Sequence, residues 1–173
     1  MIHPLHPAIV HFVIALFTFS IILDILGLLT SRDKFHYAAW VNLLGAGIAA
    51  LLAIGSGLIE ENRVTIPKFA AKSFEIHETT AFITASIVMI LIFWRIRFRS
   101  VLPKKIRIFY LAIALFGTIS LHIGTYYGTK LVYRYRIGPE SNIEIENQSR
   151  GVFPDSIQVA PDEFFYEITD SAP

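Results

Sequence analysis

The sequence predicts an all-α membrane protein: an antiparallel up-down-up-down four-helix transmembrane bundle with a mostly irregular acidic C-terminal tail. Three observations predict this fold class. Four apolar runs each approach the ~20 residues that cross the hydrocarbon core of a bilayer. The connections between the runs are short, and hydrophobic residues make up 54% of the chain against 17% charged residues. A soluble domain carries about 25% charged residues.

The four helices are expected at residues 8–29, 37–59, 76–98 and 106–127. We expect the first run to stay in the protein as a membrane helix. No basic residue precedes it and no small-residue cleavage site follows it, as a signal peptide would require. Ser73 is the expected cap of the third helix. Short connections make consecutive helices antiparallel, so residues 1–138 are expected to form one transmembrane domain.

Basic residues predict the orientation, because cytoplasmic loops carry an excess of Lys and Arg. The first and third connections and their helix ends hold the larger share: Arg32, Lys34, Arg95, Arg97, Arg99, Lys104, Lys105 and Arg107. We therefore expect a multi-pass protein of the bacterial inner (cytoplasmic) membrane with both termini in the periplasm.

The tail, residues 139–173, is expected to be extramembrane and to contact a partner. It holds eight acidic residues against Arg150 as its one basic residue, yet it keeps several aromatic side chains. Acidic runs are usually solvated. A net charge of +1 without a basic patch excludes a nucleic-acid partner. The lack of cysteine excludes disulfides, iron–sulfur ligation and c-type haem attachment by this chain.

Histidines near one membrane face are the candidate chemical groups. His11 and His77 lie in the first and third helices, and each starts the same pattern of His, Ala and Thr at steps of four and three residues. The two patterns are His11–Ala15–Thr18 and His77–Ala81–Thr84, and each falls on one helical face. If these faces oppose each other across a gap lined by small groups, the two imidazoles could hold the iron of a b-type haem from both sides.

Other readings of the same residues stay open. His122 in the fourth helix is an alternative ligand, and His3 and His6 are a weak alternative metal site, because imidazole suits Zn and Cu. Membrane histidines also form polar clusters without a cofactor. Lys130 and Arg134 are candidate haem-propionate partners or phospholipid contacts. Small-residue stripes in the second and fourth helices favour close helix packing.

Asp24 is the other charge inside a membrane segment. We expect it to be paired with Asn42 or with an arginine at a helix end, because buried charges are normally satisfied.

Two motifs carry a family resemblance. The segments HPLHPAIVHFVIAL (His3 to Leu16) and YYGTKLVYRYRIG (Tyr126 to Gly138) resemble an uncharacterised bacterial four-helix membrane family, domain of unknown function 2231. The resemblance covers residues 1 to about 138. Relatives of this kind occur fused to cytochrome c or Rieske-like modules, which implies a redox setting. The chain departs from the family pattern at Val13, at Thr129 and at His122.

The functional expectation is a non-catalytic electron-transfer or accessory subunit of the membrane, with one b-type haem near the outer face. Its partners would be the lipid bilayer and a larger membrane complex, for example with a c-type cytochrome. A cofactor-free structural or assembly subunit and a quinone- or metal-binding membrane protein are the alternatives.

Overall fold

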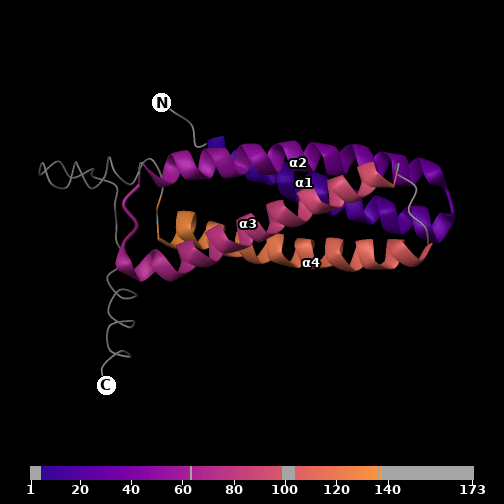
Figure 1. Ribbon diagram of the computed structural model, residues 1–173. Helices are drawn as coiled ribbons and strands as arrows, with labels where there is room; N and C mark the ends of the chain where they lie inside the picture. Colours follow the sequence, from indigo (N-terminus) through magenta and orange to yellow (C-terminus); the bar gives the residue numbers. More distant parts are fainter. Residues whose placement is uncertain (1–4, 63, 99–103, 136, 138–173) are drawn as a thin grey trace, which may run out of the picture. The chain divides into compact units, whose positions relative to one another are not determined.

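The structure, a computed structural model, describes residues 5–62, 64–98, 104–135 and 137. All regular structure in this part is helical: α1 (Leu5–Thr30), α2 (Asp33–Glu61), α3 (Lys68–Arg97), α4 (Lys104–Thr129) and a π-helical turn, η1 (Lys130–Arg134), that continues α4. The chain runs forward in α1, back in α2, forward in α3 and back in α4 (Figure 1). Each α-helix is long and apolar enough to cross a membrane. The predicted all-helical membrane bundle is confirmed.

All four helices begin earlier than predicted, α2 by four residues and α4 by two. The first begins at Leu5 instead of residue 8, because Pro7 falls in its first turn, where backbone N–H groups have no acceptor within the helix. The third begins at Lys68, eight residues before the predicted start, with Pro67 as its N-cap in an extended conformation. Ser73 is therefore buried inside α3 and does not cap it. The earlier start of α1 brings His6 into a helix.

A very tight turn joins α1 to α2. Ser31 has a φ of 54°, in the left-handed region that commonly ends a helix. Asp33, the first residue of α2, follows after one further residue. A negatively charged side chain interacts favourably with a helix N-terminus, so Asp33 stabilises the first turn of α2.

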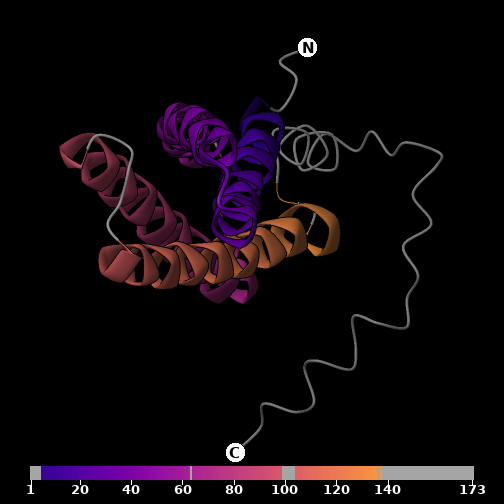
Figure 2. The ribbon, with the colours of Figure 1, turned by 90° about the vertical axis from the view of Figure 1, so that its right-hand side faces the viewer.

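The bundle is built from two helical hairpins. The most extensive contacts are those of α1 with α2 and of α3 with α4, whereas α2 meets α3 and α1 meets α4 over smaller areas. Viewed end on, α3 and α4 cross each other at an angle, and the crossing lies below the α1–α2 pair (Figure 2). The N-terminal end of the bundle is the end where α1 and α3 begin and α2 and α4 finish; the other is called the opposite end.

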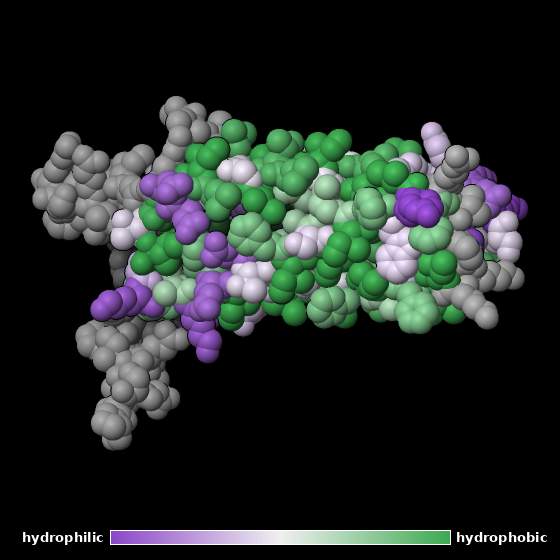
Figure 3. Space-filling model, viewed as in Figure 1, coloured by the Kyte–Doolittle hydropathy of each residue, from purple (hydrophilic) through white to green (hydrophobic). Residues whose placement is uncertain are grey.

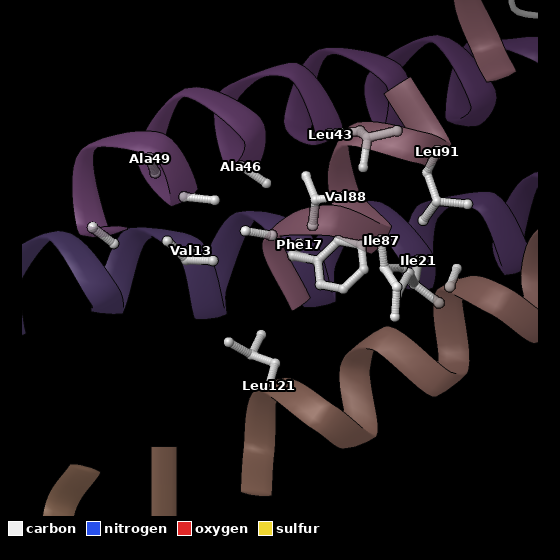
Figure 4. Close-up of a cluster of buried hydrophobic side chains, with 14 of the residues drawn as sticks. Val13, Phe17, Ile21, Leu43, Ala46, Ala49, Ile87, Val88, Leu91 and Leu121 are labelled. Carbon is white, nitrogen blue, oxygen red and sulfur yellow. The ribbon is translucent and has the colours of Figure 1, made fainter. Parts of the chain in front are cut away.

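Apolar side chains from all four helices form the core. Phe17 of α1 is fully buried at its centre and is surrounded by residues of the other helices, among them Leu43, Val88 and Leu121 (Figure 4). On the outside, hydrophobic residues cover the middle of the face shown in Figure 3, and hydrophilic residues gather toward its ends. A protein with such a surface is stable in lipid.

Small residues let the helices approach closely, as predicted. A Cβ atom added to Gly117 of α4 would lie 2.7 Å from a methyl group of Ile87 and 3.2 Å from the Phe17 ring. A Cβ on Gly124 would lie 2.6 Å from the Thr80 hydroxyl on α3. The small residues of α4 therefore allow the helices to pack closely.

Candidate functional site

Two histidines from different hairpins meet at the N-terminal end of the bundle. His6 lies in the first turn of α1 and His77 lies in the third turn of α3. Their ring centroids are 6.2 Å apart and the ring planes are nearly perpendicular, at 89°. Both side chains are partly buried. This pair joins the α1–α2 hairpin to the α3–α4 hairpin.

Backbone carbonyl groups orient both rings. His6 Nδ1 lies 2.9 Å from the carbonyl oxygen of Ala53 and 3.0 Å from the hydroxyl of Ser56, both on α2. His77 Nδ1 lies 2.8 Å from the carbonyl oxygen of Gly124 on α4. Because a carbonyl oxygen only accepts, each Nδ1 carries the proton and each Nε2 keeps its lone pair. Histidines that bind metals show this arrangement, in which the second nitrogen donates to the backbone.

Glycines make the room for the two rings. A Cβ atom on Gly57 of α2 would lie 3.1 Å from Cε1 of His6. A Cβ atom on Gly128 of α4 would lie 2.8 Å from Cε1 and Nδ1 of His77. Any larger residue at Gly128 would push the His77 ring out of its place. Gly57 and Gly128, which belong to the small-residue stripes of the second and fourth helices, thus make room for histidine rings.

Glu60 adds a negative charge to the His6 side of this site. Its carboxylate accepts a hydrogen bond from the backbone N–H of His6 at 3.4 Å. This N–H is one of those that a helix start leaves without an internal partner. The favourable interaction of a carboxylate with a helix N-terminus holds the end of α2 against the start of α1.

Two further histidines, His11 and His122, lie on the outside of the bundle. His11 is exposed, and its Nδ1 lies 2.6 Å from the carbonyl oxygen of Pro7 in the same helix. His122 is also exposed, and its Nδ1 lies 2.8 Å from the carbonyl oxygen of Thr118. The structure therefore places His6, and not His11, beside His77. His3 lies outside the described residues.

The two predicted His-Ala-Thr faces do not oppose each other; they lie on different sides of α4. On α3, Thr84 donates to the Ser120 hydroxyl at 3.2 Å and is buried against α4. Ala81, between His77 and Thr84 on that face, is partly buried. On α1, Ala15 and Thr18 line a groove that also includes His122 of α4. The reason is the strong pairing of α3 with α4, which uses the α3 face for packing.

The predicted basic residues after α4 also lie at the N-terminal end. Lys130 Nζ lies 5.3 Å from the ring centroid of Tyr135. Hydrogen bonds from Lys130 and Ser73 lower the pKa of the Tyr135 phenol below its ordinary value. The Tyr135 ring in turn packs on Phe69 of α3, with centroids 5.6 Å apart. Arg134 is exposed in η1. This turn therefore folds back over the start of α3.

A second polar cluster lies at the opposite end and involves all four helices. Arg95 of α3 donates to both carboxylate oxygens of Asp24 on α1, at 2.7 and 3.2 Å. His36 of α2 donates from Nδ1 to the same carboxylate at 2.9 Å. Arg95 also contacts the Tyr110 hydroxyl of α4 at 3.4 Å. The sequence predicted Asn42 or a helix-end arginine as the partner of Asp24. The arginine is the partner, whereas Asn42 donates to the carbonyl of Ala38 at 2.9 Å, and His36 was not predicted.

Gly27 is the sequence feature that could have indicated that His36 lies beside α1. A Cβ on this residue would lie only 2.7 Å from the His36 ring, so α1 needs a glycine where the ring crosses it. In the sequence, Gly27 stands one turn after Asp24, and His36 follows the short connection. This spacing places all three residues at the same end of the hairpin.

Clusters of three or more metal-ligating side chains are not found within the described residues. A site built by this part of the chain therefore offers two imidazoles, and any further ligands of an ion would have to come from elsewhere. A haem supplies four ligands of its own through the macrocycle nitrogens.

Comparison with known proteins gives one clear result. The model of the family described as "Predicted membrane protein (DUF2231)" matches residues 2–141. This protein belongs to that family. Neither the curated proteins nor the solved structures contain a match. The resemblance inferred from the two sequence motifs is confirmed, and the His6–His77 pair lies inside the matched region.

Proposed function

We propose that this protein is a membrane-integral electron-transfer subunit that holds one b-type haem at the N-terminal end of its bundle. His77 and His6 would be the axial ligands, in place of the pair His77 and His11 expected from the sequence. The observation that carries the proposal is the pairing of these two rings between the hairpins, 6.2 Å apart.

The spacing of the two rings fits a shared metal. Two imidazoles on opposite sides of one ion, each with a metal–nitrogen bond of about 2 Å, have their ring centroids roughly 6 Å apart. The lone pairs are also available, because both Nδ1 atoms donate to carbonyl groups. Two protein ligands are the number that a bis-His haem requires.

The position between the hairpins suits a flat macrocycle. His6 is held against α2 and His77 against α4, so a ring system between them would lie between the two helix pairs. The contacts between the two hairpins are less extensive than the contacts between the two helices of each hairpin. When bound, the haem supplies one-electron chemistry; the chain's residues orient it, exclude water from its apolar surroundings and set its potential. Lys130 and Arg134, at the same end, are proposed to neutralise its propionates.

Orientation and partners belong to the same proposal. We place the protein in the bacterial inner membrane with the N-terminal end of the bundle on the periplasmic side, because the opposite end holds the larger share of Lys and Arg. A periplasmic redox protein such as a c-type cytochrome, within a larger complex, would then exchange electrons with the haem. The tail after residue 138 is proposed to contact that partner; it lies outside the described residues.

A reduced-minus-oxidised difference spectrum of the chain, purified with its native partners, tests the proposal. We expect haem b bands that disappear in His77→Ala and in His6→Ala. Substitution of His6 by methionine tests the ligand even if alanine disturbs folding, because methionine also ligates haem iron and raises its potential. His6→Met should therefore keep the bands and shift the midpoint potential upward.

His11→Ala is the matched control, since this histidine lies one to two turns further along the same helix and faces outward. We expect its spectrum and midpoint potential to equal those of the unaltered protein. Loss of the bands in His11→Ala with retention in His6→Ala would return the assignment to His11. A spectrum without haem bands in the unaltered protein would remove the proposal and favour a structural subunit.

A further inference from the structure

Two adjoining hollows on the outside of the bundle, one between α1 and α4 and one along α4, form an open groove. It consists of two hollows of about 440 and 600 Å³ that share His122. The first hollow lies between the helices and is lined mainly by apolar residues of α1, with Asn42 of α2. The second extends along α4 to Tyr126 and Tyr127, near the end of that helix. Both hollows are shallow and open to the surroundings of the bundle.

An exposed histidine is unusual at this position of a membrane-spanning helix. It lies seven residues before Thr129, the last residue of α4, which is about 10 Å along the helix axis. Ionisable side chains within membrane segments are costly and normally face the bundle interior or a partner. When the ring is neutral and its Nδ1 donates to the Thr118 carbonyl, its Nε2 has a lone pair. The exposed nitrogen is thus a hydrogen-bond acceptor that faces the groove.

Thr18 supplies a second polar group to the same hollow. Its hydroxyl is shielded from solvent, and within the described part of the chain it has no hydrogen-bond partner. Other membrane-facing threonines behave differently: Thr118 and Thr125 each donate to a carbonyl oxygen one turn earlier, at 3.0 and 2.8 Å. An unpaired buried hydroxyl costs free energy. Rotation about χ1 of Thr18 would turn this hydroxyl toward the groove, where a ligand oxygen would satisfy it.

We propose that this groove binds an isoprenoid quinol from the bilayer. A quinol hydroxyl would donate to Nε2 of His122, and the Thr18 hydroxyl would donate to a ring oxygen. The flat ring would lie in the hollow lined by Ala15 and Phe19, and the apolar tail would follow the open groove. Phospholipid headgroups carry suitable oxygens but stay at the membrane surface, about 10 Å from this depth by the helix rise. The quinone form lacks a hydroxyl, so His122 favours the reduced ligand.

Calorimetric titration of the full chain in lipid nanodiscs with decylubiquinol and with decylubiquinone tests this site. We expect tighter binding of the quinol than of the quinone. His122→Leu and Thr18→Val should each weaken quinol binding by roughly threefold to tenfold, the value of one hydrogen bond. His122→Gln should bind almost normally, because its amide oxygen also accepts. Thr125→Val is the matched control, since this threonine lies outside the groove; it should bind as the unaltered chain does.

Equal affinity of the unaltered protein, His122→Leu and Thr18→Val would overturn the inference. So would a lack of binding by the unaltered, folded protein. If His122→Leu instead dissociates an oligomer or a copurified membrane subunit without changing quinol affinity, the groove is a helix interface and the quinol site is excluded. None of these readings requires haem, so failure here and failure of the proposed function are distinguishable.

Discussion

The ion pair between Asp24 and Arg95 gives the sharpest stability prediction. We consider three variants: Asp24→Leu, Arg95→Met and the double variant. Each single variant leaves one charged group buried without its partner. The double variant replaces both charges by apolar groups of similar length, which a membrane interior tolerates.

The magnitude follows from the burial and the number of hydrogen bonds. Arg95 is 1% exposed and Asp24 is 4% exposed. The guanidinium binds the carboxylate through two nitrogens and also donates to the His36 carbonyl at 2.9 Å. Removing one partner of such a pair costs about 3–5 kcal/mol. The double variant leaves no charge buried alone, so it should be no less stable than either single variant. The coupling free energy should therefore be at least about 3 kcal/mol, the upper end of the usual range.

Unfolding in mixed detergent micelles, followed by circular dichroism, measures these free energies. Trp40 fluorescence gives a local signal, because the Arg95 guanidinium lies 5.8 Å from its ring centroid. Asp33→Asn is the control, since Asp33 is an exposed acid at the start of α2; it should change stability by less than 1 kcal/mol. If the double variant is destabilised by the sum of the two single losses, the pair is not coupled and the reasoning fails.

Two further predictions concern the core. Gly117→Ala should destabilise the protein by about 1–3 kcal/mol, because its Cβ would lie 2.7 Å from an Ile87 methyl group; Gly55→Ala, which meets nothing within 4 Å, should be neutral or stabilising. The same unfolding assay compares them, and equal losses would show that close packing at α4 is unimportant. Phe17→Ala should cost about 3–5 kcal/mol, whereas Phe12→Ala, 64% exposed, should cost far less. A similar cost at both positions would contradict the core assignment.

Sequence patterns predicted the four helices because apolar length alone decides a membrane span. They placed every helix start too late, since polar and charged residues and the prolines Pro7 and Pro67 at the helix starts interrupt the apolar runs. His77 is partly buried in α3, and the ring beside it is that of His6 instead of the predicted His11. A one-residue change in helical phase rotates a side chain by about 100°. Whether His6 or His11 lies beside His77 therefore depends on how α1 packs on α2. The spacing of His, Ala and Thr in the sequence does not determine this packing.

For Asp24, in contrast, the type of partner could be predicted from the sequence. A buried carboxylate in an apolar helix must find a partner, so the arginine could be inferred from energetics. Which arginine it is depends on the crossing of α3 over α1 and α2. His36 joins the cluster because the turn at Ser31 is so short that α2 begins beside the end of α1.

A pyridine haemochrome assay on the chain purified with its native partners tests the central claim most directly. The proposed function predicts about one haem b per chain in the unaltered protein and in His11→Ala, and none in His77→Ala. Protein that is folded, as judged by circular dichroism, but contains no haem would contradict it.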